Sequence, residues 1–300
     1  MNQSAIVGDG VSNARGDRHN SLREHLRRGV QDMRVGLARA CLAACDTKAT
    51  RRYHECALYT RGLVRVRVAG ESAHFHVRNP RDYSHLVGEW FERPQLATFL
   101  ARLRPDDVIY EVGGHIGSWT LFIARRVPRG RVCVFEPEPG NRARLCDNVA
   151  LNGLKNVTVC APALSDETGT ARFGQCGAPS EGRHSLIVGQ VHQQVLEVPT
   201  IRLDDAPRAL GLPEPTVVKI DCEGAELAVL AGAARTLASG NVRTIFVEAH
   251  GVQLGAIGRR PDEVLAVLSA AGYVPTHTWR RSEETISIVE RESARQVACA

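Results

Sequence analysis

From about residue 107 onward, short apolar runs alternate with segments whose apolar residues recur every three or four positions. The runs predict buried β-strands and the spaced segments predict amphipathic helices. The predicted strands are DVIYEVGG, GRVCVFEPEP, NVTVCAPAL, PTVVKIDCEG, VRTIFVEAH, YVPTHTW and TISIVER. Alternating strands and helices, with strands apolar along nearly their whole length, indicate an α/β fold. We predict a Rossmann-like, seven-stranded, mostly parallel sheet with helices on both faces, in which the last two strands form an antiparallel edge.

The chain before about residue 107 does not show this alternation of strands and helices. Residues 1–20 are polar and predict a disordered tail, and apolar spacing predicts a helix from Leu22 to about Asp46. GLVRVRVAG and AHFHVRN alternate apolar and polar residues, which predicts a hairpin that turns at the intervening GES. We therefore divide the chain into the tail, a helix-and-hairpin cap over 21–87 and a main domain over 88–300.

One segment interrupts the main domain. Residues 169–203 separate the third predicted strand from the fourth and resemble two strands joined by a long loop. Loops of this length are uncommon unless they have a function or lack order. We predict that residues 174–194 form a mobile cover over a substrate opening.

Composition narrows the classes of partner. The net charge is +5 and aromatic residues make up 5%, which argues against a nucleic-acid surface. Nine scattered cysteines indicate a reducing, cytoplasmic location, and no apolar run approaches the length of a membrane span or a signal sequence. The spacing of Cys41, Cys45, His54 and Cys56 fits no common zinc module. The N-terminal helix leaves pairing into a homo-oligomer open.

A glycine-rich turn, YEVGGHIGSW, follows the first strand of the main domain. Ligands of doubly wound sheets bind at the carboxyl ends of the strands, and Gly113, Gly114 and Gly117 permit close approach to the backbone there. Val112 stands where a dinucleotide-binding turn has its first glycine, and Glu111 would repel a pyrophosphate. An acid beside a helix N-terminus instead suits the ammonium and carboxylate of S-adenosylmethionine.

The next two strands end in further acceptors. Glu136 can bind a ribose diol, and Ser165 with Asp166 can meet the amine of adenine. The candidate cofactor-binding residues are Glu111, Gly113, Gly114, His115, Gly117, Glu136, Pro137, Leu164, Ser165, Asp166 and Asp221.

Five blocks of the chain together resemble a known family. They are VIYEVGGHIGSWTLFIA, VCVFEPEPGNRARLCDNVALNGLKNVTVCAPALSDETG, VPTIRLDD, VVKIDCEGAELAVLAG and TIFVEAHG. In this order they resemble FkbM-type S-adenosylmethionine-dependent methyltransferases, from about Gly88 to Gly272. The resemblance implies a class I methyltransferase fold and O-methylation of hydroxyls, often on sugars or polyketide-like natural products, while some relatives methylate peptide nitrogen. The family usually has aspartate at Glu111, alanine at Gly114 and asparagine at His115.

Methyl transfer to an alcohol also requires removal of a proton, so a base or a metal is expected. The strand ends facing the methyl group offer Asp221, Glu223, Glu248 and His250. We predict His250 as the proton acceptor, with Asp221 and Glu223 as further catalytic residues. Alternatively, Asp221, Glu223 and Glu248 could hold Mg²⁺. Lys219 is expected to be buried and paired with an acid.

The sequence therefore predicts an S-adenosylmethionine-dependent O-methyltransferase acting on a hydroxylated small molecule. The alternatives are an N-methyltransferase of the same family, an NAD-dependent oxidoreductase, and a non-catalytic protein that uses the cofactor fold as a scaffold. No nucleic-acid or membrane partner is expected.

Overall fold

The structure is a computed structural model. It describes residues 62–79, 82, 85–86, 92–176, 184–187 and 193–292. The predicted tail, the predicted N-terminal helix, the cysteine group around Cys45 and most of the predicted cover lie outside the described residues.

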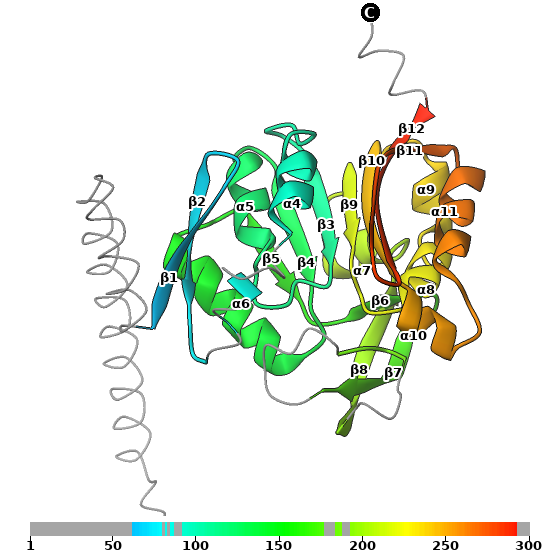
Figure 1. Ribbon diagram of the computed structural model, residues 1–300, viewed down its shortest axis with the longest axis horizontal. Coiled ribbons are helices and arrows are strands. Elements are labelled where there is room, and N and C mark those ends of the chain that lie inside the picture. Colours follow the sequence, from blue (N-terminus) through cyan, green and yellow to red (C-terminus); the bar gives the residue numbers. More distant parts are fainter. Residues whose placement is uncertain are drawn as a thin grey trace, which may run out of the picture. The chain divides into compact units, whose positions relative to one another are not determined.

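A seven-stranded sheet forms the centre of the main domain (Figure 1). Its strands are β3 (Val108–Val112), β4 (Arg131–Phe135), β5 (Val157–Cys160), β9 (Val217–Ile220), β10 (Thr244–His250), β11 (Tyr273–Arg281) and β12 (Glu284–Arg291). The order is β11-β12-β10-β9-β3-β4-β5. The two pairs that include β12 are antiparallel, and the other pairs are parallel. The predicted sheet and its antiparallel edge are confirmed. Because β3 lies between β4 and β9, the order of the strands reverses at β3, where such sheets bind ligands.

Helices cover both faces of this sheet (Figure 1). Successive residues of a strand bury opposite faces, as Ile109 and Tyr110 do in β3. One face packs against α4 (Arg93–Leu100), α5 (Thr120–Arg126) and α6 (Pro139–Asn152). The other packs against α7 (Ala206–Leu210), α8 (Glu226–Ala231), α9 (Ala234–Ala238), α10 (Gly251–Ala256) and α11 (Pro261–Ala270). None of the helices in the described part of the chain is long and apolar enough to span a bilayer.

The predicted hairpin is present and joins the core of the main domain. It consists of β1 (Leu63–Val68) and β2 (Glu71–His76). The turn lies at Ala69 and Gly70, with φ of 50° and 86°, one step earlier than the predicted GES. Two positive φ values match the twist of paired strands, which explains this position. Phe75 packs against Phe122 of α5 with ring centroids 6.3 Å apart, so the hairpin shares a hydrophobic cluster with the large sheet.

A second, three-stranded sheet corrects one prediction. It consists of β6 (Ala163–Ser165), β7 (Gly169–Gln175) and β8 (Gln194–Arg202), in the order β6-β8-β7. The two predicted strands of the insertion are confirmed as β7 and β8. The predicted strand over residues 156–164 is instead two strands, because β5 ends at Cys160 and the chain then enters the small sheet as β6.

Two helix boundaries are set by specific contacts. Glu138 caps α6, because its carboxylate accepts a hydrogen bond from the Asn141 backbone N–H at 2.5 Å. After β9, the chain forms two short helices, α8 and α9, that are divided near Gly232. A Cβ at Gly232 would lie 2.0 Å from the Ser165 carbonyl oxygen, so only glycine lets this corner pack against β6.

Candidate active site

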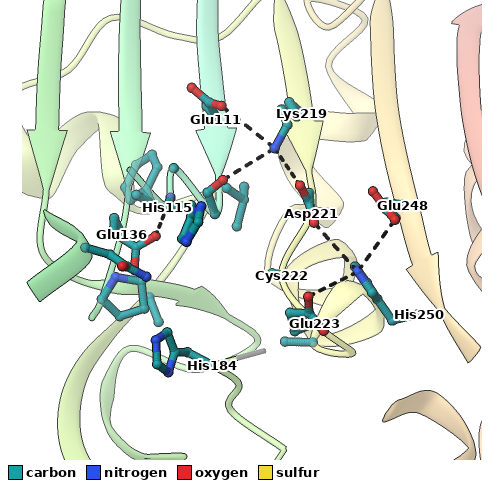
Figure 2. Close-up of a pocket in the computed structure, with 18 of the residues that line it drawn as sticks. Glu111, His115, Glu136, His184, Lys219, Asp221, Cys222, Glu223, Glu248 and His250 are labelled. Atoms are coloured by element: carbon teal, nitrogen blue, oxygen red, sulfur yellow. Dashed lines mark hydrogen bonds and ion pairs between the residues drawn. The ribbon is translucent and has the colours of Figure 1, made fainter. Parts of the chain in front are cut away.

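A cavity of about 650 Å³ opens at the carboxyl ends of the parallel strands (Figure 2). Two groups of residues line it, and we name them for use below. The glycine half comprises lining residues at the ends of β3 and β4: Glu111, Gly113, Gly114, His115, Glu136 and Pro137. The carboxylate half comprises lining residues at the ends of β9 and β10: Lys219, Asp221, Cys222, Glu223, Glu248 and His250. The predicted candidates at the ends of β3, β4, β9 and β10 are therefore brought together around one space.

The glycine turn is fixed by close backbone contacts. Gly113 has φ of 83°, and a Cβ at this position would lie 1.8 Å from the Asp221 carbonyl oxygen. The backbone of β3 therefore passes directly against the end of β9 at a point that only glycine permits. At Gly114, a Cβ would lie 2.2 Å from Cγ1 of Val134, which accounts for glycine where the family usually has alanine.

Glu136 is held by the backbone on both carboxylate oxygens. Oε2 accepts a hydrogen bond from the His115 N–H at 2.6 Å, and Oε1 accepts one from the Glu138 N–H at 2.9 Å. The residue is 5% exposed, and burial raises its pKa to about 8 despite these two bonds. Each oxygen keeps a further lone pair, so the oriented carboxylate can also accept a bond from a ligand in the cavity.

Lys219 connects the two halves and is 1% exposed (Figure 2). Its Nζ lies 3.0 Å from Oδ2 of Asp221 and 3.8 Å from Oε1 of Glu111, and it donates to the Gly113 carbonyl at 3.4 Å. Burial acts to lower the pKa of Lys219, but the two carboxylates outweigh it and raise that pKa. The predicted buried pairing is thus confirmed. Glu111 faces a lysine inside the protein as well as the cavity, and burial raises its pKa to about 7.

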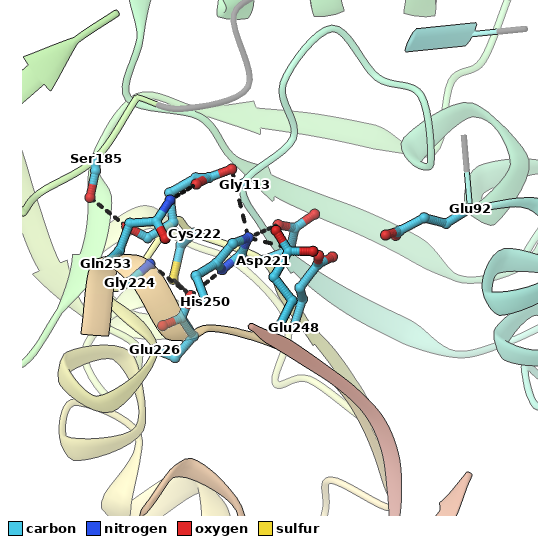
Figure 3. Close-up of polar contacts among 12 residues, drawn as sticks. Glu92, Gly113, Ser185, Asp221, Cys222, Gly224, Glu226, Glu248, His250 and Gln253 are labelled. Atoms are coloured by element: carbon cyan, nitrogen blue, oxygen red, sulfur yellow. Dashed lines mark hydrogen bonds and ion pairs between the residues drawn. The ribbon is translucent and has the colours of Figure 1, made fainter. Parts of the chain in front are cut away.

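His250, at the end of β10, is the centre of the carboxylate half (Figure 3). Its Nδ1 lies 2.7 Å from Oε1 of Glu226. Its Nε2 faces three other carboxylate oxygens, at 3.6 Å for Glu223, 3.7 Å for Asp221 and 3.9 Å for Glu248. Burial acts to lower the pKa of His250, but the surrounding carboxylates outweigh it and raise that pKa well above its usual value.

Glu223 is held in an unusual backbone conformation. Its φ is 54°, a region that costs energy for residues other than glycine and is enriched at functional sites. Oε2 accepts a hydrogen bond from Nε2 of Gln253 at 2.5 Å, and the backbone carbonyl accepts one from the Ser185 hydroxyl at 2.6 Å. Burial raises the pKa of Glu223 to about 7. Ser185 belongs to the predicted cover, and its neighbours His184 and Leu186 line the cavity.

An arginine in contact with three carboxylates lines the cavity beside the carboxylate half. The Arg281 guanidinium lies 2.7 Å from Glu92, 3.0 Å from Glu248 and 2.7 Å from Glu284. Even so, burial raises the pKa of Glu92 to about 7 and that of Glu248 to about 9. The arginine therefore does not offset the effect of burial on these acids.

Comparison with known proteins agrees with the site. Residues 111–275 match the family described as Methyltransferase FkbM domain. The chain belongs to this family. It is therefore a methyltransferase with a class I fold, and its methyl donor is S-adenosylmethionine.

Three relatives of this chain have names that state an activity. Hexuronic acid methyltransferase AglP of Haloferax volcanii is 27% identical over 226 residues, which cover 75% of this chain and 88% of AglP. The 31-O-demethyl-FK506 methyltransferase FkbM of Streptomyces tacrolimicus is 28% identical over 200 residues, which cover 57% of this chain and 74% of FkbM. The 2-O-methyltransferase NoeI of Sinorhizobium fredii is 27% identical over 159 residues, which cover 48% of this chain and 64% of NoeI.

Some of the predicted cofactor-binding residues of this chain lie away from the cavity. Leu164 lines it, whereas Ser165, Asp166 and Gly117 do not. Asp166 is exposed, and its Oδ1 accepts a hydrogen bond from the Ser165 hydroxyl at 2.9 Å. The physical reason is the early end of β5, because Ser165 and Asp166 follow a strand of the small sheet rather than one of the large sheet.

The acids that could hold a metal also differ from the predicted set. One potential ligand atom each from Asp221, Glu248 and His250 lies within 4.8 Å of the other two. His250 thus takes the place in this group that the sequence analysis assigned to Glu223. The sequence analysis also missed Glu226 as the partner of His250, because the two residues lie on α8 and β10 and meet only in the folded chain.

Proposed function

We propose that this methyltransferase transfers the methyl group of S-adenosylmethionine to a hydroxyl of a small molecule such as a sugar or another natural product. The observation that carries the proposal is the single cavity shared by the glycine half and the carboxylate half. Such a cavity can hold the cofactor at one end and an acceptor at the other. The names of AglP, FkbM and NoeI, which refer to a hexuronic acid, FK506 and 2-O-methylation, support the same class of acceptor.

In this proposal the glycine half binds the cofactor. The backbone from Gly113 onward receives the methionine end, and the oriented carboxylate of Glu136 accepts hydrogen bonds from the ribose hydroxyls. Pro137 and Leu164 provide an apolar wall for the adenine, in place of the pair Ser165 and Asp166.

The carboxylate half receives the acceptor. The hydroxyl oxygen attacks the methyl carbon, the bond from that carbon to sulfur breaks with its electrons moving to sulfur, and the hydroxyl proton passes to a base. Two neighbouring groups, 3.6 Å apart, can accept this proton: the Glu223 carboxylate, and the His250 imidazole when its Nε2 carries no proton. This scheme does not include a divalent cation at Asp221, Glu223 and Glu248.

Cofactor binding and turnover test the proposal separately. We expect S-adenosylhomocysteine to bind the full-length protein in calorimetric titration, and NAD⁺ not to bind. A panel of sugar and macrolide alcohols, with matching amines, then identifies the methylated atom by mass spectrometry. Methylation of the amines alone would replace this proposal with the N-methyltransferase alternative.

His250 gives a second test. We expect His250→Ala to lower turnover far more than it changes the dissociation constant of S-adenosylhomocysteine. An equal loss in both quantities would remove His250 from the catalytic residues.

A further inference from the structure

The His250 imidazole is aimed into the carboxylate half and is held there from behind (Figure 3). The residue is 3% exposed, and its Nδ1 is fixed by Oε1 of Glu226 at 2.7 Å. Among the described residues, Nε2 makes no hydrogen bond, since its nearest carboxylate oxygens lie at 3.6–3.9 Å. His250 lines the cavity, so there is room for another atom between Nε2 and the acids.

The separations fit a shared cation better than direct bonds. Metal–ligand bonds of about 2.1 Å place two ligand atoms of one ion between roughly 3.0 and 4.2 Å apart. Nε2 of His250 lies 3.7 Å from Oδ1 of Asp221 and 3.9 Å from Oε1 of Glu248, within this range. The three ligand atoms all lie within 4.8 Å of one another.

We propose that Asp221, Glu248 and His250 bind a divalent cation. Glu226 is the positioning residue, because a carboxylate on the far nitrogen of a histidine ligand fixes the ring orientation and its tautomer. Two carboxylates and one imidazole form a mixed oxygen and nitrogen donor set, which suits Mn²⁺.

The basic residues nearby leave this site available. Lys219 contacts Oδ2 of Asp221, so the other oxygen, Oδ1, is the one turned toward His250. Arg281 donates to Oε1 of Glu248 at 3.0 Å from the solvent side, and a carboxylate oxygen can accept a second partner.

The consequence for catalysis rests on the function proposed above. A cation at this position would lower the pKa of an acceptor hydroxyl bound to it. With His250 occupied as a ligand, the proton acceptor is Glu223, the remaining carboxylate facing Nε2. In this arrangement His250 is a ligand of the cation and Glu223 is the base.

Binding of Mn²⁺ to the metal-free full-length protein tests the site directly. We expect calorimetry and electron paramagnetic resonance to show one bound Mn²⁺ per chain. Asp221→Asn and His250→Asn should each weaken binding at least tenfold, and Glu226→Gln should weaken it by about 10–100-fold. Glu136→Gln is the matched control, since it removes an acid from the glycine half of the same cavity. It should change the Mn²⁺ affinity less than about twofold, because it removes no ligand.

Two results would overturn the inference: equal Mn²⁺ affinity in the wild type and His250→Asn, or no binding at concentrations up to about 1 mM, the range of the weakest protein cation sites. Circular dichroism of each variant shows that it is folded. Failure of the two proposals is distinguishable. Cofactor binding without Mn²⁺ binding would remove the cation alone, whereas Mn²⁺ binding without cofactor binding would support the cation and contradict the proposed function.

Discussion

The two halves of the cavity position their polar groups by different means. In the glycine half, the backbone N–H groups of His115 and Glu138 hold Glu136, and these residues follow the neighbouring strands β3 and β4. In the carboxylate half, side chains hold one another, and they come from β9, α8, β10 and the end of β11. The first arrangement requires the pairing of β3 with β4, whereas the second requires several further elements to assemble.

The acids of the two halves are also held differently. Glu136 has a backbone hydrogen bond on each oxygen, so its position does not depend on a neighbouring ion. Glu248 and Glu223 are held by the side chains of Arg281 and Gln253. Burial raises the pKa of all three acids, so the difference lies in their partners rather than in their pKa values.

The largest effect is expected at Lys219, which joins the halves through Asp221 and Glu111. Lys219→Met leaves the buried Glu111 and the half-buried Asp221 without their cation, and breaking a buried pair in this way costs about 3–5 kcal/mol. Urea unfolding should show a loss of this size. Lys155→Met, which removes an exposed lysine, should change the free energy of unfolding by less than about 0.5 kcal/mol. Similar losses in the two variants would mean that Lys219 is not the link between the halves.

The next effect is expected at Gly113, where the backbones of the halves touch. Gly113→Ala would place a Cβ against the Asp221 carbonyl in a backbone region unfavourable to alanine. We expect the free energy of unfolding to fall by about 2–4 kcal/mol and the affinity for S-adenosylhomocysteine to fall at least tenfold. The control is Gly169→Ala, since a Cβ there meets nothing within 4 Å. A normal cofactor affinity in Gly113→Ala would contradict the proposed closeness of the turn to the ligand.

Removing Glu136 should affect one half alone. Glu136→Ala removes charge-assisted hydrogen bonds to the ribose, which should weaken S-adenosylhomocysteine binding by about 1–2 kcal/mol, or roughly 5–30-fold. Glu136→Gln should lose less, because it keeps an acceptor of the same shape. Isothermal titration measures both. An unchanged dissociation constant in Glu136→Ala would show that Glu136 is a structural residue.

The same contrast explains what could be predicted from the sequence. The apolar runs predicted the seven strands, and the spacing of the glycines predicted the turn, because both signals are local. Ser165 and Asp166 were misplaced because the apolar pattern continues unbroken from β5 into β6. Glu92 and Arg281 were missed since each meets its partner only across the folded domain, and no spacing in the sequence marks such a pair.

The smallest effect is expected at Arg281, where a substitution should change the Mn²⁺ affinity but hardly change the free energy of unfolding. Arg281→Gln removes a 39% exposed guanidinium that contacts Glu92, Glu248 and Glu284. Surface ion pairs contribute little, so the free energy of unfolding should change by less than about 1 kcal/mol. The Mn²⁺ affinity should instead rise about threefold, because a competing positive charge beside Glu248 is gone. Arg280→Gln removes a neighbouring arginine without these contacts and should leave the affinity unchanged. If Arg281→Gln lowers the Mn²⁺ affinity, the arginine supports the site rather than competing with the ion.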